Sequence, residues 1–351
     1  MFKSRQISVY ICTFVIVMIF TTFGNKLREM FNKETKENEY AMVQKYLLND
    51  SPLYGYGKPK LWIHSKYEVN SRVWKSFCSR NSTDLNQPYI HLTMKTIVDH
   101  CGDDFNICLI DDNSFSKLIP SWDSKIKSFD ETSRCKIREY GMIELLHKYG
   151  GMIVPNSFIC LKNLKEMYEI GISQGAPFIC ENINRTINIV KEKKRMLYIP
   201  DLFFMGSTKN NPTILELIDF LKIRNNNCHF TSEGKFLGNV NQWCLEKIKR
   251  KEMILIGGEI IGVKTAKLKT ILIDDLMEDN FLDLHSKCCG VYIPHDEVLQ
   301  RIKYQWFAVL SCEEILKSTA IVSKYLKASI VDTSNIFTED QEIVKSQISY
   351  F

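Results

Sequence analysis

The spacing of hydrophobic positions changes repeatedly along this chain, and each change predicts a new secondary-structure element. Apolar side chains recur every three or four residues over 88–101, which predicts a helix. The apolar run FNICLI at 105–110 then predicts a strand that is buried on both faces. A second helical pattern covers 133–149, and Gly150 and Gly151 end it, as glycine commonly does just past a helix C-terminus.

The alternation of helix and strand patterns continues to about residue 326. Further strands are predicted at 60–64, 152–154, 177–180, 201–206 and 253–263, and further helices at 163–170, 212–223, 233–250 and 311–326. Strands that alternate with helices are typical of a largely parallel sheet with helices on both faces. The sequence therefore predicts an α/β domain over 58–330, and residues 331–351 are expected to form a polar tail.

An uncharged apolar segment, Ile7–Phe23, precedes this domain and predicts a transmembrane anchor over 7–23. As a helix it would be about 26 Å long, slightly short of a ~30 Å hydrocarbon core. Residues 1–6 would be an N-terminal tail and residues 24–57 a juxtamembrane stalk. A cleaved signal peptide is the alternative, because Lys3 and Arg5 precede the segment.

The orientation of the anchor stays open. Basic residues after the segment outnumber those before it, which weakly favours a cytoplasmic domain, and cysteines without a pairing pattern agree with a reducing compartment. Three glycosylation sequons, at Asn49, Asn81 and Asn184, point the other way. We expect membrane lipid to be one partner of the chain through residues 7–23.

Composition and charge exclude some classes of protein. Of 351 residues, 45% are hydrophobic and 25% charged, which is typical of a globular protein. The net charge of +5 arises from 46 basic and 41 acidic residues that are interspersed, so no basic stripe suggests nucleic-acid binding. The 12 cysteines form no CxxC pair, and several lie in apolar runs, so we expect reduced cysteines in the core.

Candidate chemistry is expected where the predicted strands end, because ligands of such sheets bind beyond the carboxyl ends of the strands. The residues at these places are His64, the pair Asp111 and Asp112, Asn156, and Glu181. The sequence contains no GxxxxGK[ST], GxGxxG, HExxH or GxSxG motif. Their absence argues against common nucleotide hydrolases, zinc proteases and serine hydrolases.

Four segments in order carry a resemblance to a known family. They are KLWIH at 60–64, FNICLIDDNSF at 105–115, LLHKYGGMIV at 145–154 and FFMGSTKNNP at 203–212. Together they resemble the capsular-polysaccharide-synthesis and sugar-binding-region (DXD-type) glycosyltransferases. The resemblance implies a type-A nucleotide-sugar fold, which is a Rossmann-like mixed sheet, with a nucleotide sugar as donor and a glycan as acceptor. The Lys-, Asn- and Ile-rich composition also resembles that of large DNA viruses.

The sequence departs from this family at its metal site. The family's Asp-x-Asp, which holds Mn²⁺ or Mg²⁺, falls on Pro155, Asn156 and Ser157, so its metal ligands cannot be carried over. The family's Ser-Asp-x-x-Arg signature is also lost, at the position of Arg138.

Three explanations remain open. In the first, a metal-independent transferase uses basic groups such as His64 or Arg138 to stabilise the departing phosphate. In the second, Asp111 and Asp112 form a relocated site for Mn²⁺ or Mg²⁺, although a strand end followed by a helix N-cap would also explain this pair. In the third, the domain is a non-catalytic, membrane- or virion-associated binding protein.

The candidate residues divide by expected role. Asp111, Asp112 and Glu181 are candidate catalytic groups; His64, Arg138, Asn156 and Gly206 are candidates for binding the donor. A solvated strand terminus is the alternative for Glu181, and a tight turn is the alternative for Gly206. Trp243 is expected in the core rather than in a sugar-stacking site.

Overall fold

The computed structural model describes residues 57–65, 87–120, 122, 126, 131–182, 199–226 and 233–330, which all belong to one compact unit. The predicted anchor at 7–23, nearly all of the predicted stalk, the polar tail and the three sequons, at Asn49, Asn81 and Asn184, lie outside the described residues. Among the described helices, none is long and apolar enough to cross a membrane.

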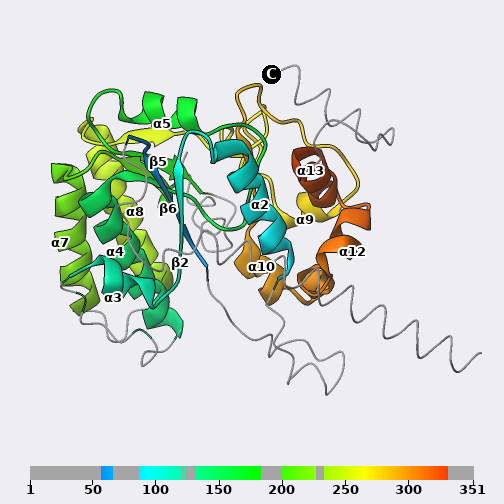
Figure 1. Ribbon diagram of the computed structural model, residues 1–351, viewed down its shortest axis with the longest axis horizontal. Helices are drawn as coiled ribbons and strands as arrows, with labels where there is room; N and C mark the ends of the chain where they lie inside the picture. The colour runs from blue at the N-terminus through cyan, green and yellow to red at the C-terminus, as the bar shows by residue number, and fades with distance from the viewer. Residues whose placement is uncertain are drawn as a thin grey trace, which may run out of the picture. The chain divides into compact units, whose positions relative to one another are not determined.

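A six-stranded mixed sheet forms the centre of the fold (Figure 1). Its strands, in spatial order, are β2 (Asn106–Ile110), β1 (Lys60–His64), β3 (Gly151–Ile153), β6 (Pro200–Ser207), β5 (Phe178–Glu181) and β7 (Ile254–Ile256). All neighbouring pairs are parallel except those of β6, which runs antiparallel to both β3 and β5. The start of β6 therefore lies at the same edge as the carboxyl ends of the other strands, and we call this the carboxyl edge.

One face of the sheet is covered by four helices: α3 (Ser114–Leu118), α4 (Glu131–Tyr149), α7 (Pro212–Asn226) and α8 (Glu233–Lys249). Alternate strand residues point to this face, because successive side chains of a strand point to opposite faces. The strand side chains that enter this first core include Trp62, Cys108, Ile110, Ile153 and Ile179. Trp243 of α8 packs against the same core and stacks on Phe220 at 5.8 Å, which confirms its predicted place.

The other face is covered by α5 (Lys165–Ile172) and by a small antiparallel sheet of β4 (Phe158–Cys160) and β8 (Gly290–Tyr292). The Phe158 ring meets the Phe204 ring edge-on at 5.2 Å, and Tyr168 of α5 meets Phe178 at 6.3 Å. Both faces of the sheet are therefore covered, but on this face α5 shares the cover with a small sheet that was not predicted.

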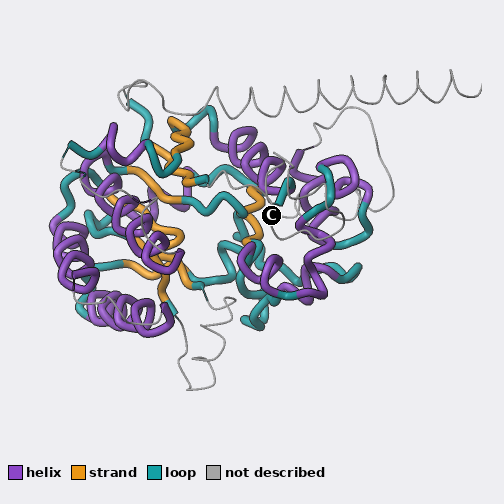
Figure 2. The backbone as a smooth tube through the Cα atoms, turned by 90° about the horizontal axis from the view of Figure 1, so that it is seen from below, coloured by secondary structure: helices purple, strands orange, loops and turns teal. Residues whose placement is uncertain are grey.

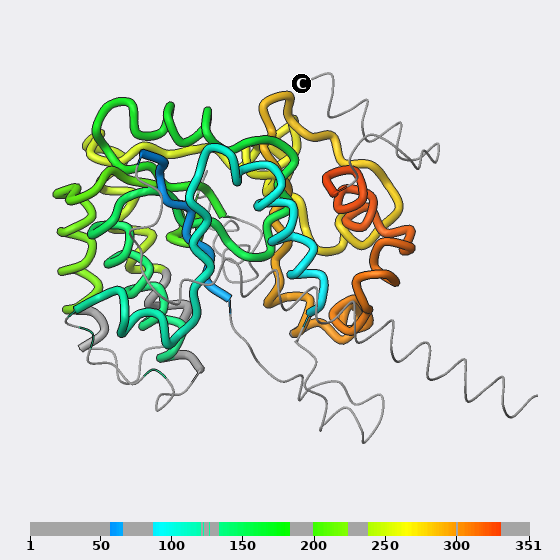
Figure 3. Tube along the Cα trace, in the orientation of Figure 1, coloured from blue at the N-terminus to red at the C-terminus, as the bar shows by residue number. Residues whose placement is uncertain are grey.

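A second core lies behind the small sheet and is built mostly from short helices (Figures 2 and 3). Its helices are α2 (Tyr89–Cys101), α9 (Ile273–Met277), α10 (His295–Gln300), the 3₁₀ helix Ile302–Tyr304, α11 (Gln305–Ala308), α12 (Cys312–Lys317) and α13 (Ile321–Ile330). Figure 3 shows α2 beside α13, although these helices come from opposite ends of the described chain.

Two predicted elements differ from the structure. The strand predicted at 253–263 ends at Ile256, because the next backbone groups leave the ladder and Gly258 N–H donates to the carboxylate of Glu181 at 3.1 Å. The helix predicted at 311–326 is two helices, because Ser318 is extended at the end of α12 and α13 begins at Ile321. The short strands β4 and β8 were not predicted.

The cysteines agree with a reduced core within the described residues. The nine cysteines of this part of the chain form no disulfide, and six of them are buried: Cys101, Cys108, Cys160, Cys180, Cys244 and Cys288. Burial raises the pKa of the Cys108 and Cys288 thiols to about 12. They pack as small apolar groups.

Candidate functional site

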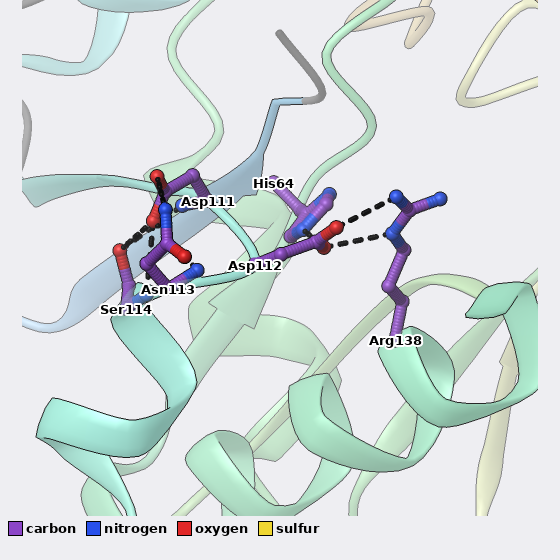
Figure 4. Close-up of polar contacts among 6 residues, drawn as sticks. All are labelled: His64, Asp111, Asp112, Asn113, Ser114 and Arg138. Atoms are coloured by element: carbon purple, nitrogen blue, oxygen red, sulfur yellow. Dashed lines mark hydrogen bonds and ion pairs between the residues drawn. The ribbon is translucent and has the colours of Figure 1, made fainter. Parts of the chain in front are cut away.

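His64 and Asp112 lie together at the carboxyl edge. His64 follows the core residue Trp62 by two positions on β1, so its side chain is on the same face, and Asp112 lies in the turn just after β2, whose last residue, Ile110, pairs with His64. Both side chains therefore project toward α3 and α4, where Arg138 lies. Figure 4 shows the three side chains converging from β1, from the residue pair after β2, and from α4.

Asp112 joins this group through both of its carboxylate oxygens. Arg138 Nε donates to Oδ1 and Arg138 Nη2 to Oδ2, each at 2.7 Å, which is a bidentate pair. His64 Nε2 lies 3.0 Å from the same Oδ1. The ring of His64 is stacked on that of Phe115 from α3, with centroids 5.6 Å apart. The imidazole is therefore held from two sides.

Burial and charge act in opposite directions on Asp112. Partial burial on its own would raise the pKa of this carboxyl group, but hydrogen bonds and charge from Arg138 and His64 hold the pKa well below its usual range. The carboxylate is therefore ionised at neutral pH. It balances the Arg138 guanidinium, which is 7% exposed.

Asp111 faces the other way and has a local role (Figure 4). Its Oδ1 accepts from the backbone N–H groups of Asn113 and Ser114 at 3.1 and 2.9 Å and from Ser114 Oγ at 2.7 Å. Its Oδ2 accepts from Asn113 Nδ2 at 3.1 Å. Although burial opposes the change, these bonds lower the pKa of Asp111. The carboxylate caps the start of α3, as the alternative interpretation of this pair expected.

The two aspartates do not form a shared site for a divalent cation. Their carboxylates are engaged by different partners, and a cation at Asp112 would compete with an arginine that already neutralises it. Within the described ranges, no three His, Cys, Asp or Glu side chains form a group that could hold a metal ion. The arrangement therefore gives the second explanation, a relocated metal site, no support.

The turn after β3, which contains Pro155, Asn156 and Ser157, is held by hydrogen bonds to elements of the second core. The Asn156 carbonyl accepts a hydrogen bond from Thr93 Oγ1 of α2. The buried Ser157 Oγ donates to Ile293 O at 2.8 Å and lies 3.3 Å from His295 Nδ1. His295 Nε2 in turn lies 3.2 Å from Asp296 Oδ1.

His295 is a titratable residue at this turn that sequence reasoning missed. It lies 138 residues from Ser157 in sequence, and no motif marks it. Only the pairing of β4 with β8, which places Tyr292 opposite Phe158, brings this imidazole to the turn. The adjacent residues His295 and Asp296, which follow the apolar residues at 291–293, could have served as a weak signal.

Glu181 ends β5 at the carboxyl edge but is not a solvated strand terminus. Its side chain is 3% exposed, and Lys264 Nζ donates to its Oε1 at 2.6 Å. Its Oε2 accepts from Gly258 N–H. The pair ties β5 to the segment that follows β7, which is an architectural contact.

Gly206 lies away from the other candidates. It pairs with Met152 and Phe178, so it sits toward the opposite end of the sheet from His64 and Asp112. A Cβ atom at Gly206 would lie 2.3 Å from the Phe178 ring. Glycine is needed here for close packing rather than for a turn, and the structure does not bring it to the carboxyl edge.

Comparison with known proteins adds little to this geometry. No protein-family model matches the sequence, and no curated protein matches it. The chain is similar to a solved structure described as "PaToxG Glycosyltransferase", with 10% sequence identity and a TM-score of 0.33. The alignment covers 92% of this chain and 94% of the chain of that structure.

Proposed function

We propose that this chain is a membrane-anchored, glycosyltransferase-like protein that binds a nucleotide sugar at the carboxyl edge of its six-stranded sheet. The supporting observation is the placement of three sequence segments that were recognised separately. The segments KLWIH, FNICLIDDNSF and LLHKYGGMIV contain β1, β2 and β3, and β1 lies between the other two strands and is parallel to both. Their carboxyl ends therefore meet where a doubly wound sheet binds its ligand.

The proposed site uses protein side chains where the family that the sequence resembles uses a metal. His64 and Arg138 supply hydrogen-bond donors at this edge, and Asp112 fixes the orientation of both. Fixed donors in a partly buried setting can stabilise a leaving diphosphate without a carboxylate-bound cation. During transfer, the hydroxyl oxygen of the acceptor would bond to the anomeric carbon as the bond from that carbon to the phosphate oxygen breaks. The diphosphate would take the electron pair of the broken bond and the proton of the hydroxyl.

Calorimetry tests the binding of a donor directly. The full chain in detergent micelles is titrated with UDP-, GDP- and CMP-linked sugars, with and without Mn²⁺. One nucleotide sugar should bind with the same affinity whether or not Mn²⁺ is present. His64→Ala or Asp112→Ala should lower the affinity for that nucleotide sugar at least about tenfold.

Asp104→Ala is the matched control. Asp104 also bonds a lysine and an asparagine, but it precedes β2 and so lies at the opposite edge of the sheet from Asp112. This variant should bind the donor like the wild type. Failure of every donor to bind the wild-type chain would contradict the proposal.

A second function, binding without catalysis, is favoured by one observation. Each candidate acidic side chain at the carboxyl edge is already engaged by a protein partner: Asp111 by the α3 cap, Asp112 by Arg138 and Glu181 by Lys264. No candidate carboxylate is thus poised as a general base. Release of nucleoside diphosphate from a bound donor, abolished by His64→Ala, would exclude this function.

The membrane part of the proposal rests on Ile7–Phe23. Its uncharged, apolar character supports an anchor. The full chain should stay with membranes after extraction with alkaline carbonate, whereas a chain lacking residues 1–23 should be released. Release of the full chain would contradict an anchor and favour the cleaved signal peptide.

A further inference from the structure

Two buried thiols meet where α2 and β4 end. Cys101 is the last residue of α2 and Cys160 the last residue of β4, and their Sγ atoms are 3.8 Å apart. Both side chains are fully buried. The elements are also joined close to the thiols, because Cys160 N–H donates to Thr96 Oγ1 of α2 at 2.9 Å.

We propose that Cys101 and Cys160 are a covalent modification site that closes reversibly into a disulfide. The bond requires the two sulfur atoms to approach from 3.8 Å to roughly 2.05 Å, which side-chain rotation and a small backbone shift can supply. The site is independent of the proposed nucleotide-sugar site. Formation of the disulfide depends on redox conditions and not on the binding of a nucleotide sugar.

Cys101 and Cys160 differ from Cys108 and Cys288 in having a second sulfur atom within contact distance, although Cys160 Sγ also contacts the backbone oxygen of Lys162 at 3.0 Å. Cys108 Sγ contacts the backbone oxygen of Asn106, and Cys288 Sγ that of Gly290. Cys101 lies in the last turn of α2, a helix end that opens locally, so it is the thiol that meets an oxidant first, with Cys160 positioned to resolve the product. Burial raises the pKa of the Cys160 thiol well above its usual value.

A small peroxide balances the reaction. The Cys101 thiolate attacks one oxygen of hydrogen peroxide, the O–O bond breaks, and the released hydroxide takes a proton to become water. The resulting sulfenic acid is then attacked by the Cys160 sulfur, the S–O bond breaks, and a second water leaves. Two thiols and one peroxide thus give one disulfide and two waters. The peroxide reaches the buried thiols when the last turn of α2 opens, since helix ends open locally.

The cross-link would fix α2 against β4 across a sequence separation of 59 residues. Closing a loop of that size restricts the unfolded chain, so oxidation should raise the Tm of the protein by at least about 5 °C. Thr93 of α2 also contacts the turn between β3 and β4. A disulfide between α2 and β4 would therefore stiffen the two elements that hold this turn.

Peptide mapping of the full chain tests the site. Reduced protein is treated with hydrogen peroxide, denatured, alkylated and digested. The expected result is a peptide pair that joins Cys101 to Cys160 and lacks two hydrogens, together with the rise in Tm. Dithiothreitol should reverse both changes.

Matched variants assign the bond. Cys289→Ser and Cys108→Ser should keep the cross-link, whereas Cys101→Ala and Cys160→Ala should each abolish it. Alkylation of both Cys101 and Cys160 after oxidation of the wild type would overturn the proposal, and so would a bond from either one to Cys289. The wild-type map decides the question even if a variant does not fold.

Discussion

Two adjacent aspartates show how strongly local geometry decides the role of a residue. Asp111 caps α3 within its own segment, whereas Asp112 reaches across to Arg138 of α4 and His64 of β1. The backbone turn after β2 points their carboxylates apart (Figure 4). Substituting the two residues should therefore have different effects on stability.

Replacement of Asp112 leaves two basic groups without their carboxylate. Asp112→Ala should lower the free energy of unfolding by about 2–3 kcal/mol, because the basic groups would lose the carboxylate that compensates for their desolvation. The loss is limited because the ion pair is only partly buried and solvent screens the remaining charges. Asp111→Ala should cost about 1 kcal/mol, the usual value of a lost cap. Urea unfolding followed by circular dichroism measures both, and equal losses would contradict the assigned roles.

The lowered pKa of Asp112 also predicts an acid-sensitive stability. Because the folded-state pKa lies below the unfolded value of about 3.9, the stabilisation is fully present well above that pH. It is lost as the pH falls through the unfolded value toward the folded one. The asparagine variant Asp112→Asn should lose less stability than the wild type between about pH 5 and pH 2. Parallel pH profiles of the two proteins would argue against this ion pair.

At the scale of elements, two glycines control how α4 passes into β3. Gly150 and Gly151 have φ of +70° and +99°, and a Cβ at Gly151 would lie 2.1 Å from the carbonyl oxygen of Lys60 in β1. A side chain there would push two paired strands apart.

Alanine substitution tests this close approach. Gly151→Ala should lower the free energy of unfolding by more than about 3 kcal/mol, because strain and a backbone clash act together. Gly175→Ala is the matched control, since Gly175 has φ of +74° but a Cβ there meets nothing within 4 Å. It should cost only about 1 kcal/mol. Thermal unfolding of both variants provides the comparison.

Much of this element structure could be predicted from the sequence, because long periodic segments carry their own signal. The helices at 88–101 and 133–149 and the strand at 105–110 agree closely with α2, α4 and β2. Gly150 marked the correct end of α4, because the residue just past this helix has a positive φ, a conformation that favours glycine.

The remaining features depend on contacts between distant segments. β4 and β8 have three residues each, which is too short for a periodic signal. The antiparallel direction of β6 follows from tertiary packing rather than from its own sequence. Of the candidate site, sequence reasoning named His64, Asp112 and Arg138 but did not predict their pairing. It placed Gly206 correctly at the end of a strand, but the antiparallel direction of β6 takes this residue to the opposite edge of the sheet.

At the scale of the whole molecule, one buried ion pair connects the sheet to the segment after β7. Glu181→Ala should destabilise the protein by about 3 kcal/mol, because Lys264 would lose the buried carboxylate that accepts its hydrogen bond. The double variant Glu181→Gln with Lys264→Met should recover part of this loss, since glutamine still accepts from Gly258 N–H. A double variant as unstable as Glu181→Ala would contradict this account.

The junction of β5 and β6 has a consequence for how the chain can be divided. Asn182 N–H donates to the carbonyl of Ile199 at 2.9 Å, so the chain leaves and rejoins the sheet at one point. The polypeptide between these residues therefore need not be continuous for the sheet to close. Co-expressed fragments 1–190 and 191–351 should assemble into a complementing pair and co-purify through a tag on one fragment, held together by the pairing of β5 with β6 and the cores that both fragments share.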